Sequence, residues 1–151
     1  MDMNNKVVLA FSGGLDTSFC VPYLKNEKGL EVHTIMVNTG GFSAEEEKAI
    51  EERALTLGAV SHTTIDAVDT YYNKGIKYLI YGNILKNATY PLSVSSERVF
   101  QALEVLKHVK KLGAGYVAHG STAAGNDQVR FDIVFEILAP EVQIIAPVRD
   151  E

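Results

Sequence analysis

The sequence is poor in residues that build several common kinds of site. Its 151 residues include one cysteine, Cys20, which excludes an internal disulfide and a zinc site made of cysteine pairs. Because Cys20 stands in an apolar run, we expect a small buried side chain there. The four histidines have no metal-ligand spacing, and only His119 merits attention as a site residue. This composition fits a reducing compartment, and we expect a cytoplasmic protein.

Long apolar runs and excess basic charge are also lacking. The longest apolar run is well short of a membrane span, and Met1–Asn5 has neither the charged nor the apolar region of a signal peptide. The net charge is −5, and the densest basic run, Lys107–Lys111, fits one solvated helix face. We therefore expect neither a membrane nor a nucleic acid partner. With 46% hydrophobic residues, the chain is expected to form one domain over residues 1–151.

Two common phosphate-binding patterns are missing from the glycine-rich stretch that we call the first loop (residues 10–18). It has no lysine for G-x-x-x-x-G-K-[ST], and its glycines lack the G-x-G-x-x-G spacing. The first loop consists of Ala10, Phe11, Ser12, Gly13, Gly14, Leu15, Asp16, Thr17 and Ser18. A strand, a Gly-Gly loop with hydroxyls and a helix start together form an anion cradle of backbone N–H groups. Asp16 suits such a loop if it caps the helix or helps to hold a magnesium ion.

The order of the predicted elements indicates an α/β fold. The first half alternates strands over Lys6–Leu9, Glu31–Asn38 and Val60–Asp66 with helices over Phe19–Lys25 and from Ser43 to Gly58. The second half has helices over Ala67–Asn83, from a loop at Ile84–Ser96 to Leu112, and over Gln128–Leu138, with strands over Gly115–His119 and Val142–Ala146. This pattern is typical of a doubly wound, five-stranded parallel sheet with helices on both faces.

Several local features refine these helices. Pro22 lies inside the first helix, where its missing N–H predicts a kink or a locally widened turn. Ser95 or Ser96 is expected to cap the helix that ends at Leu112. The helix over Gln128–Leu138 is almost entirely apolar, so we expect it to be well buried.

A second small-residue loop, Gly120–Asp127, follows another strand of the same sheet. We call it the second loop, and we expect both loops at the sheet edge where ligands bind. Arg130 follows it near a helix N-terminus, where a cation opposes the helix dipole. Such an arginine needs an anionic partner, and the residues alone leave Asp127, Asp132 and a ligand carboxylate open.

Read together, the two loops resemble those of a known family. The pattern Ser-Gly-Gly-x-Asp-Thr/Ser is similar to the pyrophosphate-binding loop of N-type ATP pyrophosphatases, which split ATP into AMP and pyrophosphate. With Tyr90–Leu92 and the stretch His119–Asp132, which contains GNDQVRF, the chain resembles the argininosuccinate synthase family in register. The resemblance implies an adenine nucleotide alpha hydrolase-like, HUP-type Rossmann-like fold. It also implies ligation of citrulline with aspartate to argininosuccinate, AMP and pyrophosphate through an adenylated citrulline, in arginine biosynthesis.

The resemblance further implies a role for each matching residue. ATP would be held by Ala10–Ser18, Val37, Ala118, His119, Gly120, Ser121 and Thr122, with Mg²⁺ as cofactor but no protein metal ligands assigned. Citrulline would contact Tyr90, Ser95, Asn126 and Arg130, while aspartate would contact Thr122, Asn126 and Asp127. The candidates for catalysis are Asp16, Asp127 and Arg130. Members of the family are considerably longer, so we expect the nucleotide-binding domain alone, inactive without the synthetase domain and the C-terminal helix used in a homotetramer.

Two departures from the family pattern affect the expected substrate and loop. After Leu92 the family has Gly-Thr-Ser-Leu-Ala-Arg-Pro, whereas Ser93–Val99 reads SVSSERV and adds the charge of Glu97. This difference leaves open a modified acceptor, such as an N-acylated citrulline. Ala123 stands where a glycine is usual, which predicts a stiffer or shifted second loop. The alternative functions are another N-type ATP pyrophosphatase, GMP-synthetase-like or tRNA-modifying, and a non-catalytic ATP-binding module.

Overall fold

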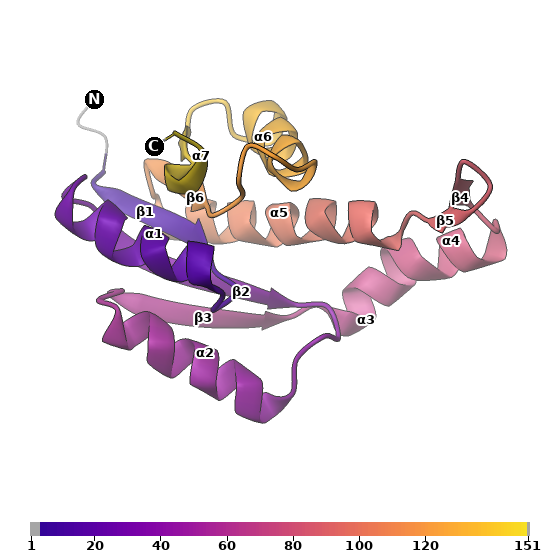
Figure 1. Ribbon diagram of the computed structural model, residues 1–151, viewed down its shortest axis with the longest axis horizontal. Helices are drawn as coiled ribbons and strands as arrows, with labels where there is room; N and C mark the ends of the chain where they lie inside the picture. The colour runs from indigo at the N-terminus through magenta and orange to yellow at the C-terminus, as the bar shows by residue number, and fades with distance from the viewer. Residues whose placement is uncertain (1–3, 151) are drawn as a thin grey trace.

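Five parallel strands form the centre of the fold in the computed structural model, which describes residues 4–150. Their spatial order is β3-β2-β1-β6-β7, with β1 (Lys6–Ala10), β2 (Glu31–Asn38), β3 (Ser61–Asp66), β6 (Tyr116–His119) and β7 (Gln143–Ile145). The predicted five-stranded parallel sheet is confirmed (Figure 1). Met1–Met3 and Glu151 lie outside the described residues. The predictions of a single domain over residues 1–151 and of no signal peptide at Met1–Asn5 include these residues.

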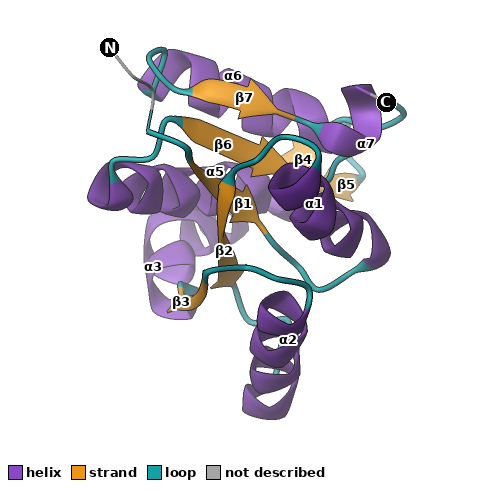
Figure 2. Ribbon diagram, turned by 90° about the vertical axis from the view of Figure 1, so that its left-hand side faces the viewer, coloured by secondary structure: helices purple, strands orange, loops and turns teal. Residues whose placement is uncertain are grey.

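Helices cover both faces of this sheet, as the alternation of elements predicts (Figure 2). One face carries α1 (Leu15–Asn26), α2 (Ala44–Thr56) and the short α7 (Pro147–Asp150), and the other carries α5 (Ser93–Leu112) and α6 (Asp127–Leu138). Successive strand residues point to opposite faces, so Val7 and Leu9 of β1 pack with α1 and α2 while Val8 packs with α5 and α6. The doubly wound arrangement therefore has two separate hydrophobic layers.

Beyond the carboxyl end of β3 the chain makes an extension that returns to the sheet through α5 (Figure 1). The extension consists of α3 (Val68–Tyr71), the π-helical turn η1 (Tyr72–Ile76), α4 (Lys77–Tyr81) and a hairpin of β4 (Leu85–Lys86) and β5 (Tyr90–Pro91). The prediction of a helix over Ala67–Asn83 is confirmed apart from its π-helical turn. The predicted loop at Ile84–Ser96 is instead a two-stranded hairpin followed by the first turn of α5.

Two other predictions about helices are wrong, and one alternative of a third is excluded. α1 begins at Leu15 rather than Phe19. It stays α-helical through Pro22, so of the two alternatives given for this position the widened turn does not form. α5 begins at Ser93 without a side-chain cap, and Tyr71 of α3 contacts this end by donating a hydrogen bond to the Ser93 carbonyl at 2.6 Å. Such a tertiary contact has no signature in the local pattern, which pointed to Ser95 or Ser96 as the cap.

The expected burial of α6 is also wrong. Phe131 and Phe135 are buried against α5 and the sheet, whereas its opposite side exposes Val129, Ile133, Ile137 and Leu138. α6 has a single neighbouring layer within residues 4–150, so one stripe is covered and the rest is not. In the same part of the chain, no helix is both long and apolar enough to cross a membrane.

Cys20 occupies the interior of α1, as the sequence predicts, and it gives a test of packing on that face. Its side chain is buried, and burial raises the pKa of the thiol to about 12, with the Asp16 charge adding to the shift. We expect a thiol reagent to label native protein far more slowly than urea-unfolded protein from pH 7 to 9. Above pH 9 the unfolded thiol ionises while the folded one keeps its proton, so the free energy of unfolding falls as the pH rises toward 12. Equal labelling rates for the native and unfolded chain would contradict this packing.

Candidate functional site

A cavity of about 740 Å³ opens at the carboxyl ends of the strands, where the two glycine-bearing loops meet. β1 pairs in parallel with β6, and Ala10 lies opposite His119. From β1 the chain winds outward through β2 and β3, then crosses back to β6 and β7 on the other side. The two loops therefore leave neighbouring strands where the strand order reverses, which is where open α/β sheets bind ligands.

The first loop is closed by its own hydroxyl groups. Thr17 Oγ1 donates to the Gly14 carbonyl at 3.2 Å and accepts from the Ser12 N–H at 3.4 Å. Gly14 is the N-cap residue of α1, and no side chain caps this helix, so Asp16 does not act as the cap. Leu15, Asp16 and Thr17 form the uncapped first turn and line the cavity. A helix start of this kind offers backbone N–H groups and a positive dipole end to an anion.

Helix α2 fixes the conformation of Gly13 from behind. Gly13 has a φ of +74°, and a Cβ at this position would lie 2.8 Å from Cγ1 of Ile50. Arg53, one turn further along α2, donates a hydrogen bond to the Gly13 carbonyl. The sequence Ser43–Glu46 (SAEE) has the pattern of a capping box, and this capping box is present at the start of α2. Position 13 thus requires glycine both for its left-handed backbone and for the space it leaves to α2.

The second loop touches the first at Gly120. A Cβ on Gly120 would lie 3.0 Å from the backbone nitrogen of Thr17 and 3.2 Å from the carbonyl carbon of Asp16. The backbones of the two loops therefore approach each other without a side chain between them. This contact joins the α1 N-terminus to the loop that carries Asn126 and Asp127.

Replacing Gly120 by alanine is expected to push the two loops apart. The added methyl group meets backbone atoms that have little freedom to move, so we expect unfolding to become easier by about 1–3 kcal/mol. We also expect weaker binding of nucleotide, since the methyl group covers the first turn of α1. Gly125→Ala is the matched control in the same loop, because its Cβ would meet its nearest atom only at 3.9 Å. Urea unfolding and calorimetry compare the two variants, and equal effects would contradict the close approach at Gly120.

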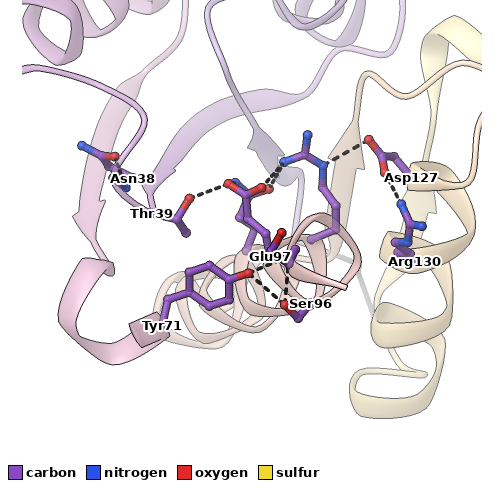
Figure 3. Close-up of polar contacts among 11 residues, drawn as sticks. Asn38, Thr39, Tyr71, Ser96, Glu97, Asp127 and Arg130 are labelled. Carbon is purple, nitrogen blue, oxygen red and sulfur yellow. Dashed lines mark hydrogen bonds and ion pairs between the residues drawn. The ribbon is translucent and has the colours of Figure 1, made fainter. Parts of the chain in front are cut away.

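The third wall of the cavity comes from the first turns of α5, which the sequence reading did not assign to the site. Glu97, Arg98 and Gln101 line the cavity there. Glu97 accepts a hydrogen bond from Thr39, which follows β2, and Figure 3 shows this contact reaching from α5 to the end of β2. Arg98 forms an ion pair with Glu97, with Nη1 3.7 Å from Oε2. Its Nε donates a hydrogen bond to Asp127 at 3.1 Å. α5 is thereby tied to both neighbouring walls.

Asp127 joins two arginines at the start of α6 (Figure 3). Its Oδ2 accepts from Arg98, and its Oδ1 accepts from Arg130 at 2.6 Å. Arg130 also donates to Ser95 Oγ at 3.0 Å. Of the partners left open for Arg130, Asp127 is the one bonded in this structure, whereas Asp132 faces elsewhere and pairs with His119 and Arg149. The guanidinium groups of Arg98 and Arg130 thus converge on one carboxylate beside the cavity.

His119 lies at the end of β6 with its ring almost fully buried. Nε2 is 2.9 Å from Asp132 Oδ1, and Nδ1 is 3.2 Å from the backbone nitrogen of Ser121. The ring stacks on Phe131 with the centroids 5.6 Å apart. Burial lowers the pKa of His119 below its usual value and outweighs the opposing effect of Asp132. The ring is therefore neutral at pH 7.

Most residues predicted for the site line the cavity. These are Ala10, Phe11, Ser12, Gly14, Leu15, Asp16, Thr17, Val37, His119, Gly120, Ser121, Thr122, Asn126, Asp127 and Arg130. Gly13, Ser18 and Ala118 lie behind this lining, and Ser95 lies beside it on Arg130. Tyr90 does not line the cavity with the other predicted residues. It lies on the β4–β5 hairpin and is 61% exposed.

The lining residues that the sequence reading missed fall into two groups. The polar group on α5 (Glu97, Arg98 and Gln101) has one usable signal, the charged pair at the start of a helix next to a loop rich in hydroxyls. The apolar group had no separate signal, because it reads as ordinary core or loop: Ile35, Met36, Gly41, Phe42, Val105 and Phe131. Gly125 of the second loop also lines the cavity, as expected of that loop.

Comparison with known proteins assigns this chain to a family. A sequence model described as the "Arginosuccinate synthase N-terminal HUP domain" matches residues 6–151. The chain belongs to the argininosuccinate synthase family. It is 46% identical over 144 residues to the argininosuccinate synthase of Xanthomonas axonopodis pv. citri (strain 306), covering 95% of this chain and 34% of that protein. The argininosuccinate synthase of Saccharolobus solfataricus is 48% identical over 144 residues, with 95% and 36% covered.

The chain spans about a third of the length of these curated relatives. Solved structures support the fold at low sequence identity. The NMN synthetase of Francisella tularensis superposes with a TM-score of 0.60 at 13% identity, over 81% of this chain and 47% of that one. The NH3-dependent NAD synthetase of Campylobacter jejuni gives 0.58 at 12% identity, over 79% and 48%. The predicted HUP-type, adenine nucleotide alpha hydrolase-like fold is thus confirmed for this member of the argininosuccinate synthase family.

Proposed function

We propose that this chain is the ATP-binding part of an argininosuccinate synthase that ligates citrulline with aspartate. One observation carries the proposal: the uncapped start of α1 and the Asp127–Arg130 pair share one cavity. An uncapped helix start after a Gly-Gly loop suits phosphates, whereas a carboxylate held by arginines beside it suits amino-acid substrates. A non-catalytic ATP-binding module has no need of the second group, so the enzyme is favoured over the module.

In this proposal ATP lies along the first loop, with its phosphates at the first turn of α1. Ser12 and Thr17 supply hydroxyls, Val37 borders the adenine, and residues 118–122 complete the site. The donor set also fits Mg²⁺, which proteins commonly hold with one or two carboxylates together with substrate phosphates. Asp16 is the better placed carboxylate, because Asp127 is already bonded to two arginines. When bound, Mg²⁺ would neutralise charge on the phosphates.

The proposed reaction has two steps, and each forms one bond while it releases one leaving group. The ureido oxygen of citrulline attacks the α-phosphorus of ATP and releases pyrophosphate, which leaves an adenylated citrulline. The aspartate amine then attacks the ureido carbon, AMP departs, and argininosuccinate remains. Arg130 would hold the citrulline carboxylate, and Asn126 would contact both substrates. This chemistry depends on positioning and charge stabilisation, which a site of loops, hydroxyls and helix ends can provide.

Further roles in the proposal rest on family likeness. Tyr90 and Ser95 would contact citrulline, while Thr122 and Asp127 would contact aspartate. For Tyr90 this requires the β4–β5 hairpin to approach the cavity when substrate binds. The enzyme would be a cytoplasmic homotetramer that acts on small molecules, with neither nucleic acid nor membrane as partner, and the remaining two thirds of the family's length would supply further substrate contacts.

Two measurements test the proposal. Calorimetric titration of this chain with MgATP, and then with AMP plus pyrophosphate, is expected to give saturable binding, and the lack of both would contradict the nucleotide site. In an enzyme that carries this domain with the rest of the family's length, citrulline is expected to support ATP–pyrophosphate exchange. An N-acylated citrulline serves as the second acceptor, because Ser93–Val99 departs from the family pattern. Exchange with neither acceptor would overturn the proposed ligase.

A further inference from the structure

We propose that His119 is a positioning residue of this site: its neutral ring, with the proton on Nε2, holds the Ser121 N–H and so keeps the second loop against α1. The His119 residue is 1% exposed, and it borders the cavity from the end of β6. The inference concerns the geometry of the free protein. Only its expected effect on nucleotide affinity rests on the proposed function.

The partners of the two ring nitrogens define which of them carries the proton. The backbone N–H of Ser121 can only donate, so Nδ1, 3.2 Å away, must be the unprotonated acceptor. A carboxylate oxygen accepts, so Nε2 must donate to Asp132 Oδ1 at 2.9 Å. A neutral ring with its proton on Nε2 satisfies both bonds. A second proton on Nδ1 would face the Ser121 N–H, and this bond would break.

The groups around the ring maintain this state. From α6, Phe131 stacks on the ring, and Asp132 accepts the hydrogen bond from Nε2–H while also pairing with Arg149. From α7, Arg149 and Asp150 are the other charged groups that act on His119, with opposite signs. Arg149 donates through Nε to Asp150 at 2.9 Å, so the line from Ser121 to α7 is a continuous series of hydrogen bonds.

The bond to Ser121 matters because of what its two neighbours do. Gly120 lies against the backbone of Asp16 and Thr17 at the start of α1. Thr122 lines the cavity on the other side of Ser121. Holding the N–H between them fixes both the contact with α1 and the position of the cavity wall. Without this bond, Ser121 loses its tie to the ring, and the positions of Gly120 and Thr122 are no longer fixed.

Two substitutions separate the two ring bonds. His119→Asn keeps an acceptor near the Nδ1 position and so can hold Ser121, whereas His119→Gln keeps a donor near the Nε2 position and serves Asp132 alone. His33→Asn is the matched control, because His33 is also buried and its pKa is also lowered by burial, but it pairs with Ser61 and does not line the cavity. We expect His119→Gln to bind MgATP about fivefold more weakly than His119→Asn, because only the Asn variant keeps the acceptor for Ser121.

The pH dependence and the ligand-free protein give independent readouts. NMR of the ring nitrogens is expected to show the proton on Nε2 at pH 7. The protection of the Ser121 amide, measured against its intrinsic exchange rate at each pH, is expected to be lost as the ring protonates below pH 6.5. Over the same pH range, MgATP affinity should fall in the unsubstituted chain and in His33→Asn, which both keep His119. The fall should be smaller in His119→Asn, which has no ring to protonate. Equal affinities of the Asn and Gln variants, a proton on Nδ1, or Ser121 exchange that ignores ring protonation would each overturn the inference. A chain that binds no MgATP would instead contradict the proposed function, and the Ser121 amide would still decide this inference.

Discussion

Replacing Arg130 by alanine is expected to lower citrulline-dependent turnover by 100-fold or more in the complete enzyme, while MgATP binding changes by no more than about twofold. The reason is that Arg130 is only 23% exposed in its side chain and bonded to Asp127 and Ser95. Asp127 keeps its bond to Arg98 when Arg130 is removed, so the main cost, about 2–5 kcal/mol, is the charged contact that Arg130 would make with the substrate. If Arg130 also holds the substrate carboxylate, the loss falls on the acceptor and not on the nucleotide.

Arg130→Lys separates charge from geometry in this experiment. Lysine keeps the positive charge but lacks the planar fork that bonds Asp127 and Ser95 together, so we expect it to recover only part of the turnover. Lys107→Ala is a control on the outer surface, where Lys107 pairs with Glu104 within α5. The acceptor KM and kcat, together with calorimetric MgATP affinity, provide the measurement. Unchanged turnover in Arg130→Ala would remove this residue from the substrate site.

The second large effect is expected at Gly13, where alanine should lower the free energy of unfolding by about 2–4 kcal/mol. About 1 kcal/mol comes from placing alanine at a φ of +74°, and about 1–3 kcal/mol comes from crowding Ile50 in the core beneath. Nucleotide affinity should fall as well, because α2 can no longer hold the Gly13 carbonyl through Arg53 in the same position. Urea unfolding with and without MgATP measures both effects.

Gly29→Ala is the control that separates the two causes. Gly29 has a φ of +66°, similar to that of Gly13, but a Cβ there would meet nothing within 4 Å. Its alanine variant should therefore show the cost of the left-handed backbone alone, about 1 kcal/mol, with nucleotide binding unchanged. A Gly13 variant no less stable than the Gly29 variant would show that the contact with Ile50 adds nothing.

The sequence predicted the sheet and both loops because each depends on local, periodic information. Alternating strands and helices fix the winding of an α/β sheet, and the carboxyl ends of parallel strands necessarily share an edge. The first and second loops therefore meet as expected, with Ala10 opposite His119. The capping box at Ser43 and the buried Cys20 were equally accessible to local reasoning.

The parts that the sequence did not predict depend on contacts between distant segments. The early start of α5 coincides with a bond between Tyr71 and Ser93, 22 positions apart. The wall formed by Glu97 and Arg98 depends on their bonds to Thr39 and Asp127, and neither is visible in the pattern of α5 itself. Local propensity also cannot distinguish a helix covered on all sides from α6, which has one covered stripe.

The pairing of β1 with β6 links the site to the folding of the entire domain. Val7 of the first strand lies opposite Tyr116, so the two loops meet only when strands far apart in the chain have paired. A nucleotide that spans both loops would bind no partly folded form that lacks this pairing. Its binding energy would therefore stabilise the domain as one cooperative unit, and the temperature of unfolding would rise with ligand concentration for both hydrophobic layers together.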